Sequence, residues 1–300
     1  MSIIVASVLP PFTLNLWQDI QGILSYGFMR QALLAGTILS CVAGLIGFFV
    51  VLRHQAFAGE SLSDVAFTGS MGGAAIGINP LITLIGTTII IAIAMGGFGE
   101  RLKGRDVAIG TVLAWVLGLG VLFLYLFNAH VSGVGTGYSG VNILFGNILG
   151  ISADQTTVIA IISGLVIFVL AFIARPLLFA SLDPNVAAAQ GVPVRALGLS
   201  FMVLLAVTVS IATMAVGALL VFALLLLPAA IAYQMTTRPF VALVLSALLA
   251  VLLTWLGIAI GFYTGYSSSV CISLMGFVCY VVVVGGRSGV RHLQVSSHRR

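Results

Sequence analysis

Charged residues are scarce in this sequence, in which Asp, Glu, Lys and Arg make up 6% of 300 residues while 61% are hydrophobic. A soluble domain of this length needs more polar surface to cover its core. The scarcity of charge therefore excludes a soluble protein and predicts a polytopic membrane protein. The formal net charge of +5 does not indicate a nucleic-acid partner, because the basic residues are spread among the connections rather than clustered on one face.

Catalytic and metal-binding motifs are also lacking. The three cysteines lie in apolar runs without ligand-like spacing, and we interpret them as small hydrophobic residues rather than disulfides or a zinc site: Cys41, Cys271 and Cys279. The four histidines lie in connections or near the C-terminal end: His54, His130, His292 and His298. There is no nucleophile-and-base spacing and no phosphate-binding loop of the GxxxxGKS or GxxxxGKT type. We therefore expect a chain that is not an enzyme and binds no cofactor of its own.

A basic stretch followed by a long apolar run is missing from the first 26 residues, and the apolar run ahead of Pro10 and Pro11 is short. No cleaved signal peptide is expected there. The same segment contains Trp17, a residue type that concentrates at the headgroup level of membranes. Residues 1–26 are therefore predicted to form an interfacial lead-in.

Long apolar runs fill residues 27–286, which are predicted to form one transmembrane domain. Their lengths are close to the ~17–25 residues that a helix needs to cross a bilayer. They predict an all-α polytopic membrane helical bundle of about eight or nine transmembrane helices, with spans at about 27–52, 61–78, 81–99, 106–127, 155–174, 195–214, 216–236, 240–261 and 269–285. The connection near Ala215 is so short that one broken helix is an alternative to two spans there.

Two features interrupt this regular pattern of spans. Pro228 lies inside the run at 216–236, and a kink is expected at that point. Between the fourth and fifth spans lies a glycine-rich stretch with a short apolar piece at 141–149, which is a candidate for re-entering the membrane.

The distribution of basic residues predicts the orientation, because Lys and Arg concentrate in cytoplasmic connections. With an external N-terminus and nine crossings, only Arg30 lies outside. All other basic residues then face the cytoplasm: Arg53, Arg101, Lys103, Arg105, Arg175, Arg195, Arg238, Arg287, Arg291, Arg299 and Arg300. This orientation places the polar connection 181–195 and a basic tail at 287–300 in the cytoplasm.

The polar connection at 181–195 predicts a short helix at about 183–191. Asp183 followed by proline is a helix-start signal, the alanines around Ala187 favour helix, and Gly191 with Pro193 stops it. A short helix projecting from a membrane bundle is suited to act as a lever for a soluble motor subunit. The alternative is a plain connecting helix.

Glu60 and Asp64 are the only carboxylates flanked on both sides by long apolar segments. On a helix they lie on one face, about 40° apart. An ionisable group inside a bilayer costs at least ~2.5 kcal/mol and usually marks an ion path or a paired site. The alternative is that both lie at the cytoplasmic interface, near Arg53, and cap a helix that begins near Ser61.

Four stretches resemble the membrane permeases of zinc/manganese/iron ABC importers, over about residues 28–284. VLRHQAFAGESLSDVAFTG resembles the family's LRR–aliphatic–GDALSHA–PG pattern, with Glu60 at its aspartate and Asp64 at its histidine. RDVAIG at 105–110 and LFGNILGIS at 144–152 follow. The most specific match is LDPNVAAAQGVPVRALGL followed by AVGALLVFALLLLPAAIA.

The resemblance implies an importer of divalent transition metal ions in the bacterial inner membrane. It implies a homodimer, a separate ABC ATPase docked at the 183–191 helix through Asp183, Ala187, Gly191 and Pro193, and an extracellular metal-binding lipoprotein. The family associates the aspartate and histidine of its DALSHA stretch with the metal, which points here to Glu60 and Asp64. The chain departs from the family pattern, because an oxygen donor replaces the histidine. Oxygen donors favour Mn²⁺ or Fe²⁺, and imidazole favours Zn²⁺.

Two other functions are compatible with parts of the sequence. An ABC permease for a metal chelate, of the siderophore or cobalamin type, would need a wide aromatic-lined cavity, and the carboxylate pair argues against it. A stand-alone transporter would use Glu60 and Asp64 as a proton relay, but such proteins tend to have repeated halves, and no convincing internal repeat is present.

Overall fold

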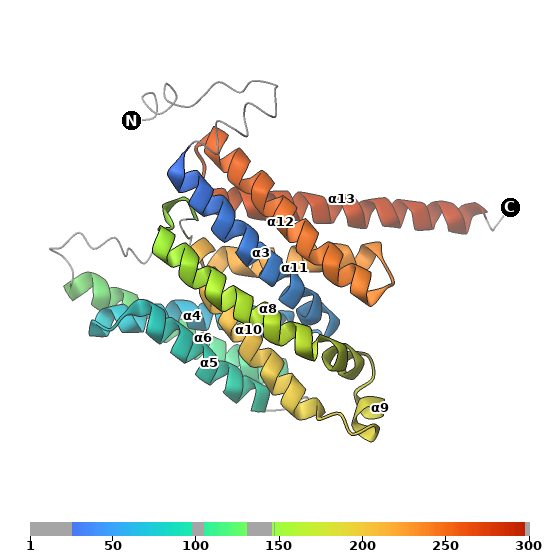
Figure 1. Cartoon of the computed structure of the whole chain (residues 1–300), viewed down its shortest axis with the longest axis horizontal. Helices are drawn as coiled ribbons and strands as arrows, with labels where there is room; N and C mark the ends of the chain where they lie inside the picture. Colours follow the sequence, from blue (N-terminus) through green and yellow to red (C-terminus); the bar gives the residue numbers. More distant parts are fainter. Residues whose placement is uncertain (1–25, 98–104, 131–145, 147, 298–300) are drawn as a thin grey trace.

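The computed structural model describes residues 26–97, 105–130, 146 and 148–297, and these residues form helices and short connections without any strand (Figure 1). In chain order the elements are α3 (Gly27–Leu52), α4 (Ala56–Ile76), α5 (Pro80–Gly97), α6 (Arg105–His130), the 3₁₀ turn η1 (Ile148–Gly150), α8 (Ala153–Leu182), α9 (Pro184–Ala189), α10 (Val194–Val216), α11 (Ala218–Met235), α12 (Pro239–Thr264) and α13 (Ser268–Ser297). The predicted all-α bundle is therefore confirmed.

Eight of the described helices are long and apolar enough to cross a membrane. The remaining long helix, α4, is less apolar because it carries both carboxylates and many small residues, but its 21 residues are of spanning length. Successive long helices run in alternating directions along the bundle (Figure 1). Counting α4, the chain runs along the bundle nine times, so the predicted range of eight or nine is confirmed.

Three helices extend well beyond their predicted limits. α4 begins at Ala56 rather than near Ser61, and α8 continues through Pro176 to Leu182 instead of stopping at residue 174. Proline is tolerated in membrane helices, where neighbouring groups satisfy the backbone carbonyl that it leaves free. α13 continues to Ser297, past the predicted end at residue 285. The predicted lead-in at 1–26 and most of the candidate re-entrant piece at 141–149 fall outside the described residues.

The chain breaks between α10 and α11 at a single residue. Gly217 has φ +91° and ψ 152°, a conformation that only glycine adopts readily. The chain reverses direction there, so that α11 runs back along the bundle beside α10 (Figure 1). This arrangement confirms two spans and excludes the alternative of one broken helix. Pro228 lies inside α11, and the kink expected there stays a prediction.

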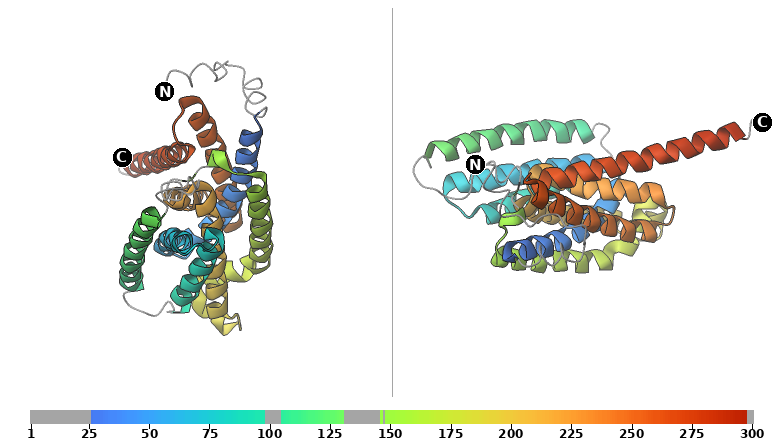
Figure 2. Two further views of the ribbon diagram at one scale, coloured as in Figure 1. Left: turned by 90° about the vertical axis from the view of Figure 1, so that its left-hand side faces the viewer. Right: turned by 90° about the horizontal axis from the view of Figure 1, so that it is seen from above.

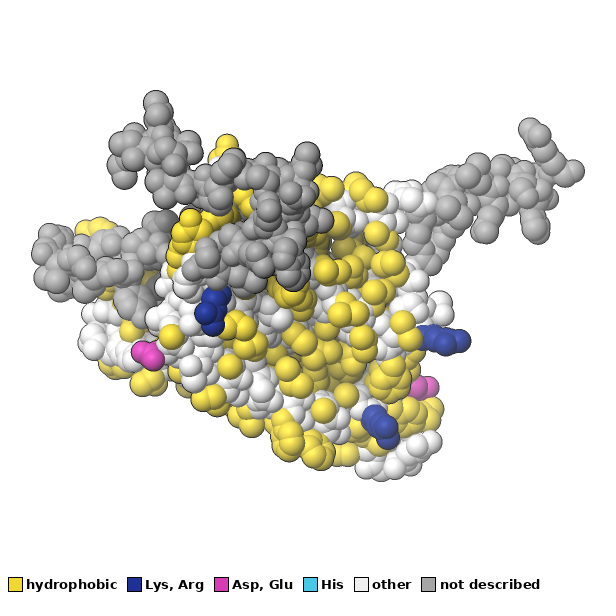
Figure 3. Space-filling model, turned by 45° about the horizontal axis from the view of Figure 1, so that its top comes forward, with side chains coloured by type: hydrophobic (Ala, Val, Ile, Leu, Met, Phe, Trp, Pro, Cys, Tyr) yellow, Lys and Arg dark blue, Asp and Glu magenta, His cyan; other side chains and the backbone are white. Residues whose placement is uncertain are grey.

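The core of the bundle lies around α3, α4 and α10, in which most residues of the spanning segments are buried. Phe49 of α3 and Phe201 of α10 are fully buried and pack edge to face with ring centroids 6.1 Å apart. Less than a quarter of the spanning segment is buried in α5, α6, α8 and α13. On the face seen in Figure 3, hydrophobic side chains cover most of the described surface and few are charged, as expected for contact with lipid tails.

The helix ends that carry the predicted cytoplasmic arginines gather at one end of the bundle. Arg53 caps the end of α3, Arg195 lies in the first turn of α10, and Arg238 precedes α12. These ends and α9 lie together on the right of Figure 1. The grouping agrees with the one-sided distribution of charge on which the orientation was predicted.

Candidate functional site

The candidate site is built on α4, which lies between α6 on one side and α5, α10 and α11 on the others (Figure 2, left). Close packing depends on small residues. A Cβ added at Gly69 or Gly73 would overlap the hydroxyl groups of Thr87 and Thr83 on α5. The glycines of α4 therefore let α5 approach closely.

Polar side chains fix α4 against α6. The Thr68 hydroxyl lies 3.0 Å from the carbonyl oxygen of Val116 on α6 and 3.1 Å from that of Asp64 in its own helix. A Cβ added at Gly72 would lie 3.2 Å from the ring of Phe123 on α6. The contacts leave α4 one defined position beside α6, and they involve the backbone of Asp64 directly.

A second hydrogen bond joins α4 to α11. The hydroxyl of Ser63 donates to the carbonyl oxygen of Ala218, the first residue of α11, over 2.7 Å in the buried interior. One turn further along, Phe67 and Met71 form a buried apolar cluster with Ala218. The second and third turns of α4 are therefore attached to the junction at which α10 and α11 meet.

The two predicted metal residues lie in the second and third turns of α4. Glu60 is exposed, Asp64 is half-buried, and the helix places them on one face. In the part of the chain that is described, neither carboxylate group has a hydrogen-bond or salt-bridge partner. Two like charges four residues apart on a helix repel each other, so the pair is stabilised when a cation lies between them.

Helix capping does not account for these carboxylates. α4 begins at Ala56 with Gln55 as its N-cap, no side chain caps it, and its first turn contains no acidic residue. The helix therefore starts too early for either carboxylate to cap it, and the alternative start near Ser61 is wrong. Across the described ranges, His, Cys, Asp and Glu side chains form no cluster of three or more that would hold a metal. Among the described residues, one protomer thus offers two carboxylates and no third ligand of these types.

The four residues predicted to dock the ATPase lie in and beside α9. Asp183 caps the helix by accepting backbone amide bonds from Asn185 and Val186, at 3.1 and 3.0 Å. Gly191 follows the helix with φ +82°, and Pro193 precedes α10. Ala187 is fully buried, whereas the other residues of α9 are exposed. The helix therefore projects from the bundle while one side chain fixes it, and the predicted start and stop are confirmed.

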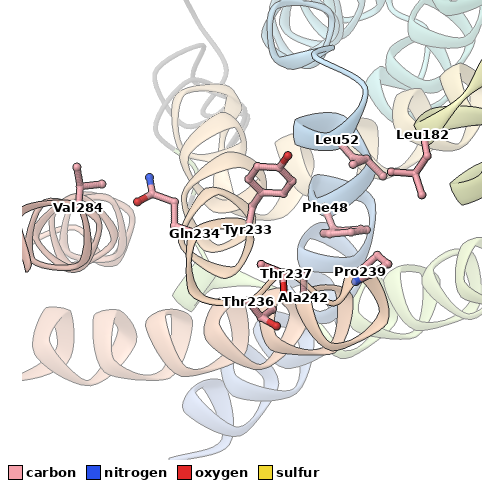
Figure 4. A pocket seen from close by; sticks show the side chains of 10 residues that line it. All are labelled: Phe48, Leu52, Leu182, Tyr233, Gln234, Thr236, Thr237, Pro239, Ala242 and Val284. Atoms are coloured by element: carbon pink, nitrogen blue, oxygen red, sulfur yellow. The ribbon is translucent and has the colours of Figure 1, made fainter. Parts of the chain in front are cut away.

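A cavity that was not predicted from the sequence lies at the same end of the bundle as α9. It has a volume of about 730 Å³ and lies among α3, α11, α12, α13 and the end of α8 (Figure 4). Its walls are partly apolar and partly polar: Phe48, Leu52, Leu182, Tyr233, Gln234, Thr236, Thr237, Pro239, Ala242 and Val284. These residues come from distant segments that share no motif. Glu60 and Asp64 do not line the cavity.

Comparison with known proteins agrees with this architecture. The manganese transport system membrane protein MntC of Halalkalibacterium halodurans is 33% identical over 238 residues, which is 79% of each chain. The high-affinity zinc uptake system membrane protein ZnuB of Haemophilus influenzae is 31% identical over 71% of this chain and 80% of that protein. PsaBC from Streptococcus pneumoniae, solved in complex with Fab, has the same fold, with a TM-score of 0.77 at 24% identity over 89% of this chain and 94% of that one. Residues 25–286 match the ABC 3 transport family. The chain is therefore a multi-pass membrane permease that belongs to the ABC 3 transport family.

Proposed function

We propose that the chain is the permease subunit of an ATP-driven importer and that divalent transition metal ions cross the membrane along Glu60 and Asp64. The observation that carries this proposal is the pair of unpartnered carboxylates on one face of α4, inside a membrane bundle. Carboxylate oxygens are ligands for Mn²⁺, Fe²⁺ and Zn²⁺. The names of the manganese and zinc relatives support the same substrate class.

Two carboxylates are too few for a complete coordination shell of Mn²⁺, which accepts up to six oxygen ligands. The remaining donors come from backbone carbonyls, water, or a second copy of the chain whose α4 faces the first. A homodimer with the ion path between its protomers satisfies this requirement. The exposure of Glu60 in the single protomer supports this arrangement, because a charged side chain facing lipid is costly.

ATP hydrolysis then takes place on a separate ATPase that docks at α9. The exposed face of this helix, its cap at Asp183 and its position at the arginine-rich end of the bundle support a cytoplasmic docking site. The C-terminus lies on the same side, and an extracellular metal-binding lipoprotein delivers the ion at the opposite end.

The experiment is uptake of radioactive Mn²⁺, Fe²⁺ and Zn²⁺ by the permease reconstituted with its ATPase in liposomes. Glu60→Gln combined with Asp64→Asn removes both charges and keeps similar shapes, so uptake should fall to background while expression and dimerisation stay normal. Asp154→Asn is the matched control, because Asp154 is an exposed acid in the first turn of α8. Full uptake by the double variant excludes the metal site, and a wild type that transports none of the three ions excludes the function.

A further inference from the structure

The junction between α10 and α11 is held by residues from three other parts of the chain. Ser63 of α4 donates a hydrogen bond to the Ala218 carbonyl over 2.7 Å, and Ser269 of α13 donates to the Val216 carbonyl over 3.2 Å. A Cβ added at Gly146 would overlap the backbone of Val216. Gly217 itself has the glycine-only conformation described above. The junction is therefore attached closely to α4, α13 and Gly146 and is not a loose connection.

Ser63 links this junction to the candidate metal residues. It directly precedes Asp64 and lies three residues after Glu60, so its Cα moves with both. Its side chain is 2% exposed. The neighbouring Ser61 donates to the Phe57 carbonyl of its own helix, which is the usual arrangement for a serine inside a helix. Ser63 instead reaches across to α11, so its hydrogen bond sets the position of α4 relative to the junction.

The other end of α10 lies beside α9. α10 begins at Val194, three residues after Gly191, and its 23 residues correspond to a rod of about 34 Å at 1.5 Å per residue. Most of its spanning segment is buried. The backbone amide of Val192 also bonds to the Ala187 carbonyl over 3.1 Å, which attaches the connection to α9. A displacement of α9 is therefore carried along α10 to Gly217, because a buried helix moves as a unit.

We propose that Ser63 is a positioning residue, whose hydrogen bond to Ala218 makes Glu60 and Asp64 follow the movements that α10 receives from α9. The proposal rests on the proposed function, in which the carboxylates contact the ion and α9 contacts the ATPase. Ser63 does not contact the ion in this arrangement. It holds the α4 turn that carries both carboxylates at the level of the junction.

The test compares Ser63→Ala with Ser246→Ala in the permease–ATPase complex reconstituted in liposomes. Ser246 is the matched control, because its hydroxyl also donates over 2.7 Å to a backbone carbonyl, that of Gly44, and is fully buried between α12 and α3. With Mn²⁺ as the transported ion, the KM and the number of ATP molecules hydrolysed per ion are measured. For Ser63→Ala we expect the KM to rise about fivefold, the factor that corresponds to one buried hydrogen bond, and more ATP to be consumed per ion. Ser246→Ala should leave both quantities at wild-type values.

A conservative variant and a backbone variant complete the test. Ser63→Thr keeps the hydroxyl, so its KM and its ATP consumption per ion should both be at wild-type values. If the side chain acted only through its shape, Ser63→Thr would be as impaired as Ser63→Ala. If Ser63→Ala fails to insert, Gly217→Ala takes its place, because it distorts the junction without touching the hydroxyl and should raise the KM in the same direction.

The outcomes separate this proposal from the proposed function. Wild-type KM and ATP consumption in Ser63→Ala, or in Gly217→Ala where that variant replaces it, overturn the positioning role. An equal change of the KM and ATP consumption in Ser246→Ala overturns it as well, because the loss of any buried serine hydroxyl would then have the same effect. Uptake that survives Glu60→Gln with Asp64→Asn instead excludes the metal site itself.

Discussion

The carboxylate of Asp183 accepts a hydrogen bond from the backbone amide of Val186, and the 3.0 Å contact starts α9 at the end of the bundle. The same oxygen accepts from Asn185, so two amides that a helix start leaves free are satisfied by one side chain. With only six residues, α9 is too short to be stable by itself, and its cap contributes a large share of its order.

Replacing this cap should weaken the contact with the ATPase. Asp183→Ala removes both hydrogen bonds, which costs about 1 kcal/mol of helix stability, whereas Asp183→Asn keeps an oxygen that accepts them. We expect the affinity of the permease for its ATPase to fall about fivefold for Asp183→Ala and to change little for Asp183→Asn. Pull-down titration of the detergent-solubilised complex measures this difference. Equal affinities for the two variants would mean that the cap has no part in docking.

Gly191 offers a test of the proposal that α9 acts as a lever for the ATPase. Its φ of +82° resists a side chain, and leucine there costs about 1–2 kcal/mol even though the surrounding space is open. We expect Gly191→Leu to insert normally but to separate ATP hydrolysis from transport, because α9 takes another orientation. Gly164→Leu is the control, since Gly164 lies inside α8, where its φ is helical and the space around it is also open. Substrate-stimulated ATPase activity at the wild-type level in Gly191→Leu would contradict the assignment.

The sequence predicted the helices well where physical signals were local. Asp183 with Pro184 predicted the start of α9, and Gly191 its end, because capping and left-handed conformations depend on a few adjacent residues. The membrane spans were predicted from the lengths of the apolar runs alone. Helix ends inside the membrane were less predictable. The predicted end of α8 at residue 174 was wrong, because the helix continues through Pro176. The start of α4 was expected near Ser61, whereas the helix begins at Ala56.

Contacts between distant segments gave no sequence signal. Ser63 and Ala218 are 155 residues apart, and the Thr88–Ser210 pair is 122 apart. A serine in a small-residue stretch has many possible partners, and only the packing of the complete bundle selects one. The cavity of Figure 4 is unpredictable for the same reason, since its walls come from five helices and a connection. The carboxylate pair could be singled out as a candidate site from the sequence, because charged residues are rare in such an apolar chain.

The buried hydroxyl pair Thr88 and Ser210 should stabilise the contact between α5 and α10. The two hydroxyl groups are hydrogen-bonded to each other in a fully buried position, and Thr88 also lies 2.8 Å from the Leu84 carbonyl. Ser210→Ala or Thr88→Val should each lower the free energy of unfolding by about 1 kcal/mol. The double variant should lose less than the sum, because no hydroxyl is then left without a partner. Denaturation of the four proteins in detergent gives the coupling, and strict additivity would mean that the pair does not interact.

The last prediction concerns the choice of metal. Glu60 and Asp64 supply hard oxygen donors, which suit Mn²⁺ or Fe²⁺, whereas an imidazole at residue 64 would suit Zn²⁺. Zn²⁺ outranks Mn²⁺ in affinity at most sites, so selectivity must come from geometry, in which Mn²⁺ accepts more ligands than tetrahedral Zn²⁺. We therefore expect the wild type to transport Mn²⁺ or Fe²⁺ and Asp64→His to shift the preference towards Zn²⁺. Asp64→Asn is the matched control, because it removes the same charge without adding a nitrogen ligand for Zn²⁺.

The measurement is uptake of radioactive Mn²⁺ and Zn²⁺ in the same liposomes, with wild type, Asp64→His and Asp64→Asn compared at equal protein density. An increase of the zinc-to-manganese ratio by about tenfold in Asp64→His alone, which corresponds to about 1.4 kcal/mol of differential binding, would assign the choice to residue 64. The same increase of the ratio in Asp64→Asn would assign the change in preference to the lost charge of Asp64 and not to the added nitrogen ligand. A wild type that carries Zn²⁺ and ignores Mn²⁺ would contradict the oxygen-donor argument, because the carboxylates would then hold the ion without selecting it.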